Sequence, residues 1–444
     1  MTSASLRIGK RQKIDFAWVL SGNVLYSACQ WGIVLVLAKL GTAVQVGEYA
    51  LALAVSAPVV LFANLQLRVL LASDVNNKFS FGQYLTFRSL SLAGAMVAVG
   101  AIANTQADTR RASLILLMGF AQVLEIVSDI YYGLLQKHNR MDRISHSLIL
   151  KGPLSLGMLA VAMYMTRSVA WAVAGLALGR LLVLVSFDVR LGFLENAGGA
   201  RPTHLWEWNA GNMGRLLRTA FPLGVISLLV ALNSNVPRYF VESYAGTADL
   251  GIFSAIFSLL TAGNLVVGAF GQSIFLPVAM ACANFDRAQY RVYVAQAVAL
   301  GGVLGAGGIL AATFFGGFIL SNLFRTEYGA RADIFVWLTI AGTIGFMASG
   351  LGYVMTAARS MKPQIPLLAA TVLAAAAASV WLIPRYGLQG AAVAALVTAM
   401  VQLAGSALIL IRIDKQLRPA PGEVGLFHGL AALEAKSVPE RIEA

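Results

Sequence analysis

One apolar stretch of the sequence, 112–135, carries four polar residues at three- and four-residue steps: Gln122, Glu125, Asp129 and Tyr132. In a helix this spacing places all four on one face. A carboxylate costs about 2.5–3.5 kcal/mol at the centre of a bilayer, so this face is expected to point into the protein. A carboxylate buried there can exchange a proton or a sodium ion, or form a structural ion pair with another helix. Glu125 and Asp129 are therefore candidates for coupling to an ion gradient.

Three arginines also lie inside apolar stretches. Arg180 is at the midpoint of 169–191, where its guanidinium cannot easily reach either membrane surface. It therefore needs an anion, either a carboxylate of 112–135 or a phosphate of a substrate. Arg88 and Arg238 lie nearer the ends of their stretches, so each could line a cavity or extend its side chain to the lipid headgroups.

Uncharged polar residues extend the same pattern. Asn235 shares a helical face with Arg238 and Glu242, and Asn23 lies within the first apolar stretch, 16–38. Polar and charged groups on the inward faces of several helices are typical of a substrate pathway through a membrane protein. We predict a hydrophilic cavity of mixed charge, lined by residues from both halves of the chain.

Catalytic and metal-binding patterns are absent from the sequence. Its four histidines lie in or beside predicted loops without the spacing of metal ligands, and no Walker-type phosphate loop occurs. Two cysteines indicate no disulfide framework. We expect neither a cofactor nor a metal, and we expect that the protein is not an enzyme.

The elements that must position these residues are membrane-spanning helices. Hydrophobic residues make up 58% of the 444-residue chain, charged residues only 12%, and the mean hydropathy is +0.74. Apolar runs of about 20 residues cross a bilayer as helices, because lipid leaves backbone polar groups no other partner. Twelve such spans are predicted: 16–38, 46–67, 84–103, 112–135, 145–165, 169–191, 220–241, 250–277, 292–318, 332–357, 364–383 and 388–411.

The distribution of positive charge predicts the orientation of these spans. The formal net charge is +13, but the cations lie in short loops rather than on one soluble face, so we expect no nucleic-acid partner. Most Lys and Arg residues fall on the side that holds both termini. Because cationic loops resist translocation, both termini are expected in the cytoplasm.

The two halves of the chain share a short repeat. Gly41-Thr42-Ala43 aligns with Gly246-Thr247-Ala248, and with one gap Gly47 aligns with Gly251. The copies follow the first and seventh spans, so both have the same orientation and predict a parallel repeat.

We therefore expect an all-α membrane protein of about twelve transmembrane helices in two six-helix lobes. The predicted parts are a basic cytoplasmic N-terminus, an N-terminal lobe, a cytoplasmic linker, a C-terminal lobe and a cytoplasmic polar tail: 1–15, 16–191, 192–218, 219–411 and 412–444.

Short motifs across 14–412 resemble bacterial polysaccharide flippases, the polysaccharide-transporter branch of the multidrug/oligosaccharidyl-lipid/polysaccharide exporter superfamily. They are Ser21-Gly22-Asn23, Leu37-Ala38-Lys39-Leu40-Gly41, Val46-Gly-Glu-Tyr-Ala-Leu-Ala52, Pro237-Arg-Tyr-Phe-Val241, Leu250-Gly-Ile-Phe-Ser-Ala255 and Tyr386-Gly387 with Gly390-Ala391-Ala392. The resemblance implies two six-helix lobes around a V-shaped cavity. It also implies movement of an undecaprenyl-pyrophosphate-linked oligosaccharide, an O-antigen or exopolysaccharide repeat unit, across the bacterial inner membrane.

The leading hypothesis is a lipid-linked oligosaccharide flippase that works by alternating access. Arginines would attract the pyrophosphate, Gln, Asn and Tyr side chains would bind sugars, and the pathway's glycosyltransferases and polymerase would be partners. The carboxylates of 112–135 depart from the family's cationic cavities. Two alternatives stay open: a multidrug cation antiporter of the same superfamily, and a membrane-embedded glycan polymerase or ligase. The second would need a long outer loop with catalytic charges, which the sequence lacks.

Overall fold

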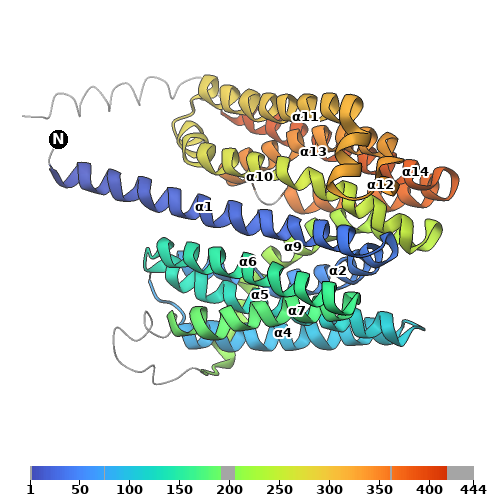
Figure 1. The fold of residues 1–444 in the computed structure, drawn as a ribbon. Helices are drawn as coiled ribbons and strands as arrows, with labels where there is room; N and C mark the ends of the chain where they lie inside the picture. Colours follow the sequence, from blue (N-terminus) through green and yellow to red (C-terminus); the bar gives the residue numbers. More distant parts are fainter. Residues whose placement is uncertain (1–2, 75, 192–205, 361–362, 418–444) are drawn as a thin grey trace, which may run out of the picture.

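The computed structural model describes residues 3–74, 76–191, 206–360 and 363–417, and every regular element in these ranges is a helix (Figure 1). The long helices of the first half are α1 (Ser3–Leu40), α2 (Ala43–Asn64), α4 (Phe81–Asn104), α5 (Thr109–Lys137), α6 (Met141–Thr166) and α7 (Val169–Val183). A π-helical turn, η1 (Leu184–Asp188), continues α7. The second half contains α9 (Ala210–Ala245), α10 (Thr247–Ala283), α11 (Arg287–Leu323), α13 (Ala332–Ala357) and α14 (Gln364–Gln416). Two short helices, α3 (Leu67–Ser73) and α12 (Thr326–Gly329), lie in connections.

Eleven of these helical segments are long and apolar enough to cross a membrane. The last of them, α14, holds two crossings, because its backbone breaks at Gly387 with φ 55° and ψ −131°. Glycine adopts this left-handed conformation without the steric cost that a Cβ would add. The described residues therefore contain twelve helical segments long enough to cross a membrane, and the predicted all-helical, multi-span fold is confirmed.

Several boundaries differ from the predicted ones. The basic N-terminus from Ser3 onward is helical and continues into α1, and α9 begins at Ala210, inside the predicted linker. The second span ends at Asn64, because Leu65 and Gln66 both adopt left-handed conformations before α3 begins. Most of the predicted linker (192–205) and most of the predicted tail (418–444) lie outside the described residues.

Consecutive long helices alternate in direction, so both ends of the described chain lie on one side of the bundle. We call this the N-terminal side and the opposite one the far side. Helices α4 to α7 form one group in Figure 1 and α10 to α14 another, with α1 passing between them. Contacts of α2 with α9 and α10 join the two halves.

The sequence repeat lies at the point where the two halves meet. A Cβ built on Gly47 would lie 1.8 Å from the carbonyl oxygen of Thr247, and one built on Gly251 would lie 1.9 Å from that of Ala43. Ala43 and Thr247 are the first residues of α2 and α10, so the contact is reciprocal. Only glycine permits the two backbones to approach this closely.

Ionic and hydrogen-bonded contacts also join the halves on the far side. Arg111, at the start of α5, pairs with Glu242 of α9 at 2.9 Å and donates to the Thr247 hydroxyl at 3.2 Å. Arg325 donates to the carbonyl oxygen of Lys39 at 2.9 Å. The far ends of the two halves are therefore in direct contact.

Candidate functional site

A cavity of about 380 Å³ lies between the two halves, and we call it the cationic cavity. Helices α1, α2, α5 and α7 line it from the first half, and α9 and α10 line it from the second. Its polar and charged lining residues include Gln30, Trp31, Tyr49, Gln122, Glu125, Arg180, Asn235, Arg238 and Ser254. Five of the residues expected to form the cavity therefore line it: Gln122, Glu125, Arg180, Asn235 and Arg238.

Arg180 faces this cavity from α7 and has a carboxylate partner. Its Nη2 lies 2.8 Å from Oε2 of Glu125, and its Nη1 donates to the carbonyl oxygen of Ala121 at 2.9 Å. The hydroxyl of Tyr26 donates to the other oxygen of Glu125. Of the anions considered from the sequence, Glu125 is the one that Arg180 contacts, and this pair accounts for a buried charge at the membrane midpoint.

Arg238 faces the same cavity without a carboxylate. Its Nη1 donates to Oδ1 of Asn235 at 2.9 Å, and its guanidinium carbon lies 5.5 Å from the centre of the Phe257 ring. No ion pair joins Arg238 to a carboxylate within the described ranges. An arginine so placed brings into the cavity a positive charge that pairs with no carboxylate of the described residues.

Several hydrogen-bond donors of the residues that line the cationic cavity have no partner among the described residues. Four buried donor groups lack a hydrogen-bond partner among the described residues: Trp31 Nε1, Arg180 Nε, Arg238 Nε and Ser254 Oγ. Leaving a buried donor unpaired costs about 1–3 kcal/mol each, so a ligand that accepts hydrogen bonds would be stabilised here. The charged residues of the lining are two arginines and one glutamate, which leaves one positive charge in excess.

Two predicted site residues lie together outside this cavity. Arg88 is fully buried, and its Nη1 donates to the backbone and side-chain oxygens of Asn64 at 2.8 and 2.6 Å. Asp129 pairs with Arg68 at 3.2 Å and lies 4.0 Å from Arg88. The structure therefore places Arg88 and Asp129 in an ion-paired cluster between helices.

Tyr132 lies in a second buried cluster. Its hydroxyl is 2.7 Å from that of Ser147 and accepts from Nζ of Lys151 at 2.6 Å. Lys151 pairs with Asp188 at 3.1 Å, and each of these two side chains is 1% exposed. The sequence analysis missed this pair. The sequence feature that could have indicated this pair is a lysine within one predicted span, 145–165, and an aspartate near the end of the next, 169–191.

Asn23 is exposed on α1 and does not line the cationic cavity. Gln30 and Trp31 of the same helix do line it, although the sequence analysis did not select them. Glu242, which was predicted to share a helical face with Arg238, does not line the cavity and pairs with Arg111 on the far side.

Residues 14–281 match the polysaccharide biosynthesis protein family. The capsular polysaccharide biosynthesis protein CapF of Staphylococcus aureus is 26% identical over 396 residues, covering 88% of this chain and 96% of the relative. An inward-facing multidrug resistance MATE family transporter of the MOP superfamily is similar in fold, with a TM-score of 0.69, 11% identity and coverage of 89% and 96%. The lipid II flippase MurJ, in an inward closed conformation, gives a TM-score of 0.68 at 12% identity, with coverage of 95% and 93%.

Proposed function

This chain belongs to the polysaccharide biosynthesis protein family, and from this premise we propose that it is a flippase for a lipid-linked oligosaccharide. Its fold is that of MATE and MurJ transporters. The cargo in this proposal is an undecaprenyl-pyrophosphate-linked repeat unit that crosses the bacterial inner membrane during surface polysaccharide biosynthesis. Glycosyltransferases would supply this cargo and a polymerase would consume it, while the chain itself catalyses no bond change.

The unpaired donors of the cationic cavity carry the proposal. A pyrophosphate offers many acceptor oxygens and multiple negative charges, which match the guanidinium and indole groups of the residues that line the cavity. A drug cation would instead need free carboxylates, and the one carboxylate of the lining, Glu125, already pairs with Arg180. The charge and donor balance of the cavity therefore favours an anionic cargo over the cationic cargo of a drug antiporter.

Arg238 is the first residue to which the pyrophosphate would bind in this mechanism, because no protein carboxylate competes for it. Arg180 would add further donors on the opposite wall while keeping its bond to Glu125. The apolar lipid tail needs no site of this kind, because it remains in the hydrocarbon of the bilayer.

Glu125 is the residue through which an ion gradient would couple to this step. Protonation of its carboxylate removes the charge that neutralises Arg180, so the cavity becomes more cationic and binds pyrophosphate more strongly. Asp129 has a different environment, since it contacts Arg68 and Arg88 outside the cavity. We therefore assign coupling to Glu125 alone of the two carboxylates.

The structure corresponds to an inward-facing state in this proposal. With the N-terminal side in the cytoplasm, as the loop charges favour, the contacts around Gly47, Gly251 and Arg111 close the periplasmic side. Rocking of the halves about this contact would then open the cavity alternately to each leaflet.

The test is the leaflet distribution of lipid-linked repeat units in cells that lack the gene. We expect these units to accumulate in the cytoplasmic leaflet, and we expect wild-type protein to restore export. Arg238→Gln, which removes the unpaired cation, should fail to restore it at an equal level in the membrane. Arg385→Gln is the matched control, because Arg385 stacks on Trp381 at 4.4 Å and does not line the cavity. An unchanged leaflet distribution in the deletion strain would overturn the proposal.

A further inference from the structure

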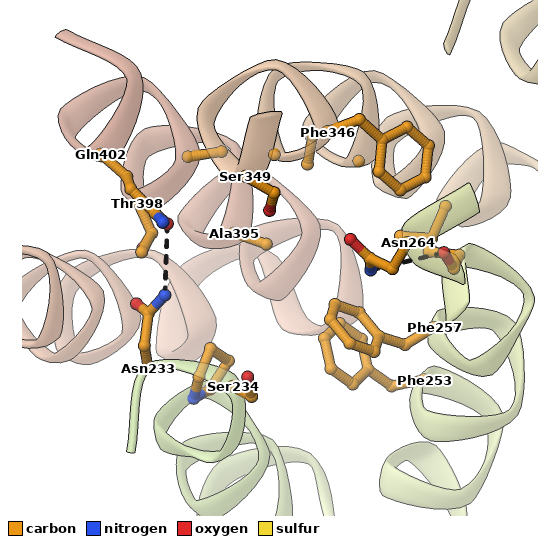
Figure 2. A pocket seen from close by; sticks show the side chains of 16 residues that line it. Asn233, Ser234, Phe253, Phe257, Asn264, Phe346, Ser349, Ala395, Thr398 and Gln402 are labelled. Carbon is orange, nitrogen blue, oxygen red and sulfur yellow. Dashed lines mark hydrogen bonds between the residues drawn. The ribbon is translucent and has the colours of Figure 1, made fainter. Parts of the chain in front are cut away.

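The second half contains a separate cavity of about 170 Å³ (Figure 2). It lies between α9, α10, α13 and the part of α14 after Gly387, and we call it the neutral cavity. None of its sixteen lining residues carries a charge. The groups that it offers are side-chain amides, hydroxyls and phenyl rings.

The amides of the neutral cavity have unused hydrogen-bonding capacity. Asn233 and Gln402 face each other across it, with Nδ2 of Asn233 donating to Oε1 of Gln402 over 3.5 Å (Figure 2). Oδ1 of Asn233 is buried and has no partner among the described residues. Asn264 makes one long bond, 3.5 Å, to the carbonyl oxygen of Leu260. An amide presents donors and an acceptor together, as a sugar hydroxyl group also does, so the two complement each other.

Aromatic rings flank these amides. Phe253 and Phe257 of α10 stack at 6.0 Å between ring centres, and Phe346 of α13 lies on the other side of Asn264 (Figure 2). A pyranose has C–H faces as well as hydroxyl edges, and a site built of rings around a few directed polar groups matches both.

A neighbouring cavity of about 360 Å³ continues the neutral cavity. The two share Asn264, Ser349 and Gln402, and the second adds Tyr353 and Gln364. Its lining is also free of charged residues. Together they provide room for more than one sugar ring.

The neutral cavity also adjoins the cationic cavity. Phe257 lines both, and the guanidinium of Arg238 lies over the ring of Phe257. Asn235, in the cationic lining, directly follows Ser234, in the neutral one. One ligand with an anionic group joined to an uncharged polar portion would therefore contact both cavities at once.

We propose that the neutral cavity is a carbohydrate subsite that binds uncharged sugar rings next to the pyrophosphate. The inference rests on the proposed function and deepens it by assigning the glycan to the second half. A uronic acid would bring a carboxylate into a lining with no cation to pair with it, and burial of an unpaired charge is strongly unfavourable. The subsite therefore selects neutral sugars over acidic ones.

Gly345 provides the sharpest perturbation of this subsite. It lines the neutral cavity, and a Cβ built on it meets no atom within 4 Å. Gly345→Leu therefore fills the cavity without disturbing the helix, in which leucine is more favourable than glycine. Gly307→Leu is the matched control, since Gly307 also has open space around its Cβ but lies exposed on α11, outside both cavities.

Asn264→Leu provides a second variant that keeps the side-chain volume and removes the amide. Its matched control is Gln272→Leu, an exposed amide on the same helix that lines neither cavity. Loss of one or two hydrogen bonds corresponds to a decrease in affinity of about tenfold.

The assay compares the binding of three lipids to the purified full-length protein in detergent. They are undecaprenyl pyrophosphate, the same lipid with a neutral N-acetylhexosamine disaccharide, and the same lipid with a uronate-containing disaccharide. We expect the neutral glycolipid to bind most tightly, and Gly345→Leu and Asn264→Leu to reduce its affinity about tenfold while leaving undecaprenyl pyrophosphate unchanged. Both control variants should bind all three lipids like the wild type.

Two outcomes would overturn the carbohydrate subsite and leave the flippase proposal intact. In one, the neutral glycolipid binds the wild type no more tightly than undecaprenyl pyrophosphate. In the other, the two cavity variants weaken the binding of both lipids equally. Failure of the proposed function gives a different result, because the wild type would then bind none of the three lipids and Arg238→Gln would change nothing.

Discussion

The buried pair of Lys151 and Asp188 leads to a quantitative prediction about stability. Their side chains are each 1% exposed and lie 3.1 Å apart, and the Tyr132 and Ser147 hydroxyls complete the cluster. Removing one partner of such a pair leaves an uncompensated buried charge, which costs about 3–5 kcal/mol. We therefore expect Lys151→Met and Asp188→Leu each to lower the free energy of unfolding by about that amount.

The double variant should behave differently from the sum of the two. When both charges are replaced by apolar groups of similar size, the net change is near zero or stabilising, by about 1–4 kcal/mol. The Tyr132 and Ser147 hydroxyls, which lie 2.7 Å apart, remain as partners for each other. The coupling energy between the two substitutions should therefore be about as large as the losses of the two single variants added together.

Equilibrium unfolding of the purified protein in mixed micelles measures all three variants. The control is Arg291→Gln, because Arg291 is 59% exposed and Asp414 keeps Arg287 as a partner. An exposed pair contributes about 0–1 kcal/mol, so this control should be close to the wild type. Single variants that resemble the control, or losses that simply add in the double variant, would contradict a stabilising buried ion pair between Lys151 and Asp188.

Three further predictions concern the far-side contact and the coupling residue. Gly47→Leu should keep the far side from closing, because its Cβ would overlap the carbonyl oxygen of Thr247; distances between spin labels on the two halves should increase and transport should stop. Arg111→Gln removes the 2.9 Å pair with Glu242, but Arg111 is 40% exposed. The free-energy difference between the closed and open far side should therefore change by about 1 kcal/mol or less, and the measured distances should shift only slightly. Glu125→Gln should tighten undecaprenyl pyrophosphate binding and remove the dependence of transport on an ion gradient, and an unchanged affinity would contradict the role given to Glu125.

The positions of the membrane-spanning helices could be predicted from the sequence, because hydrophobicity and length determine which segments cross a membrane. The backbone break at Gly387 falls between the predicted spans 364–383 and 388–411. The ends of α1 and α9 were predicted less well. Both helices extend beyond their apolar runs into polar sequence, where hydropathy carries no information about helix length.

The sequence could offer candidate partners for the buried charges, such as the carboxylates of 112–135 for Arg180, but could not select among them, because the partners lie on different helices. Periodicity placed Glu125, Asp129 and Tyr132 on one face of α5, and the structure nonetheless puts each in a separate polar cluster. Neighbouring helices decide this, since α7 brings Arg180 to Glu125 and α6 brings Lys151 to Tyr132. The neutral cavity gave no signal either, because scattered amides and phenyl rings on apolar helices resemble ordinary packing residues.

The two halves share a repeat, yet their interiors differ in chemistry. Among the described residues, the buried charged residues all belong to the first half, Arg88, Lys151, Arg180 and Asp188, whereas Arg238 of the second half is only partly buried. The buried polar residues of the second half are uncharged. Both halves have a glycine at their contact, Gly47 in one and Gly251 in the other, because any larger side chain would prevent the close approach of the two backbones. In the proposed flippase, the repeated glycines would form the contact about which the halves move, and the two cavities of different chemistry would bind the two chemically distinct portions of one cargo.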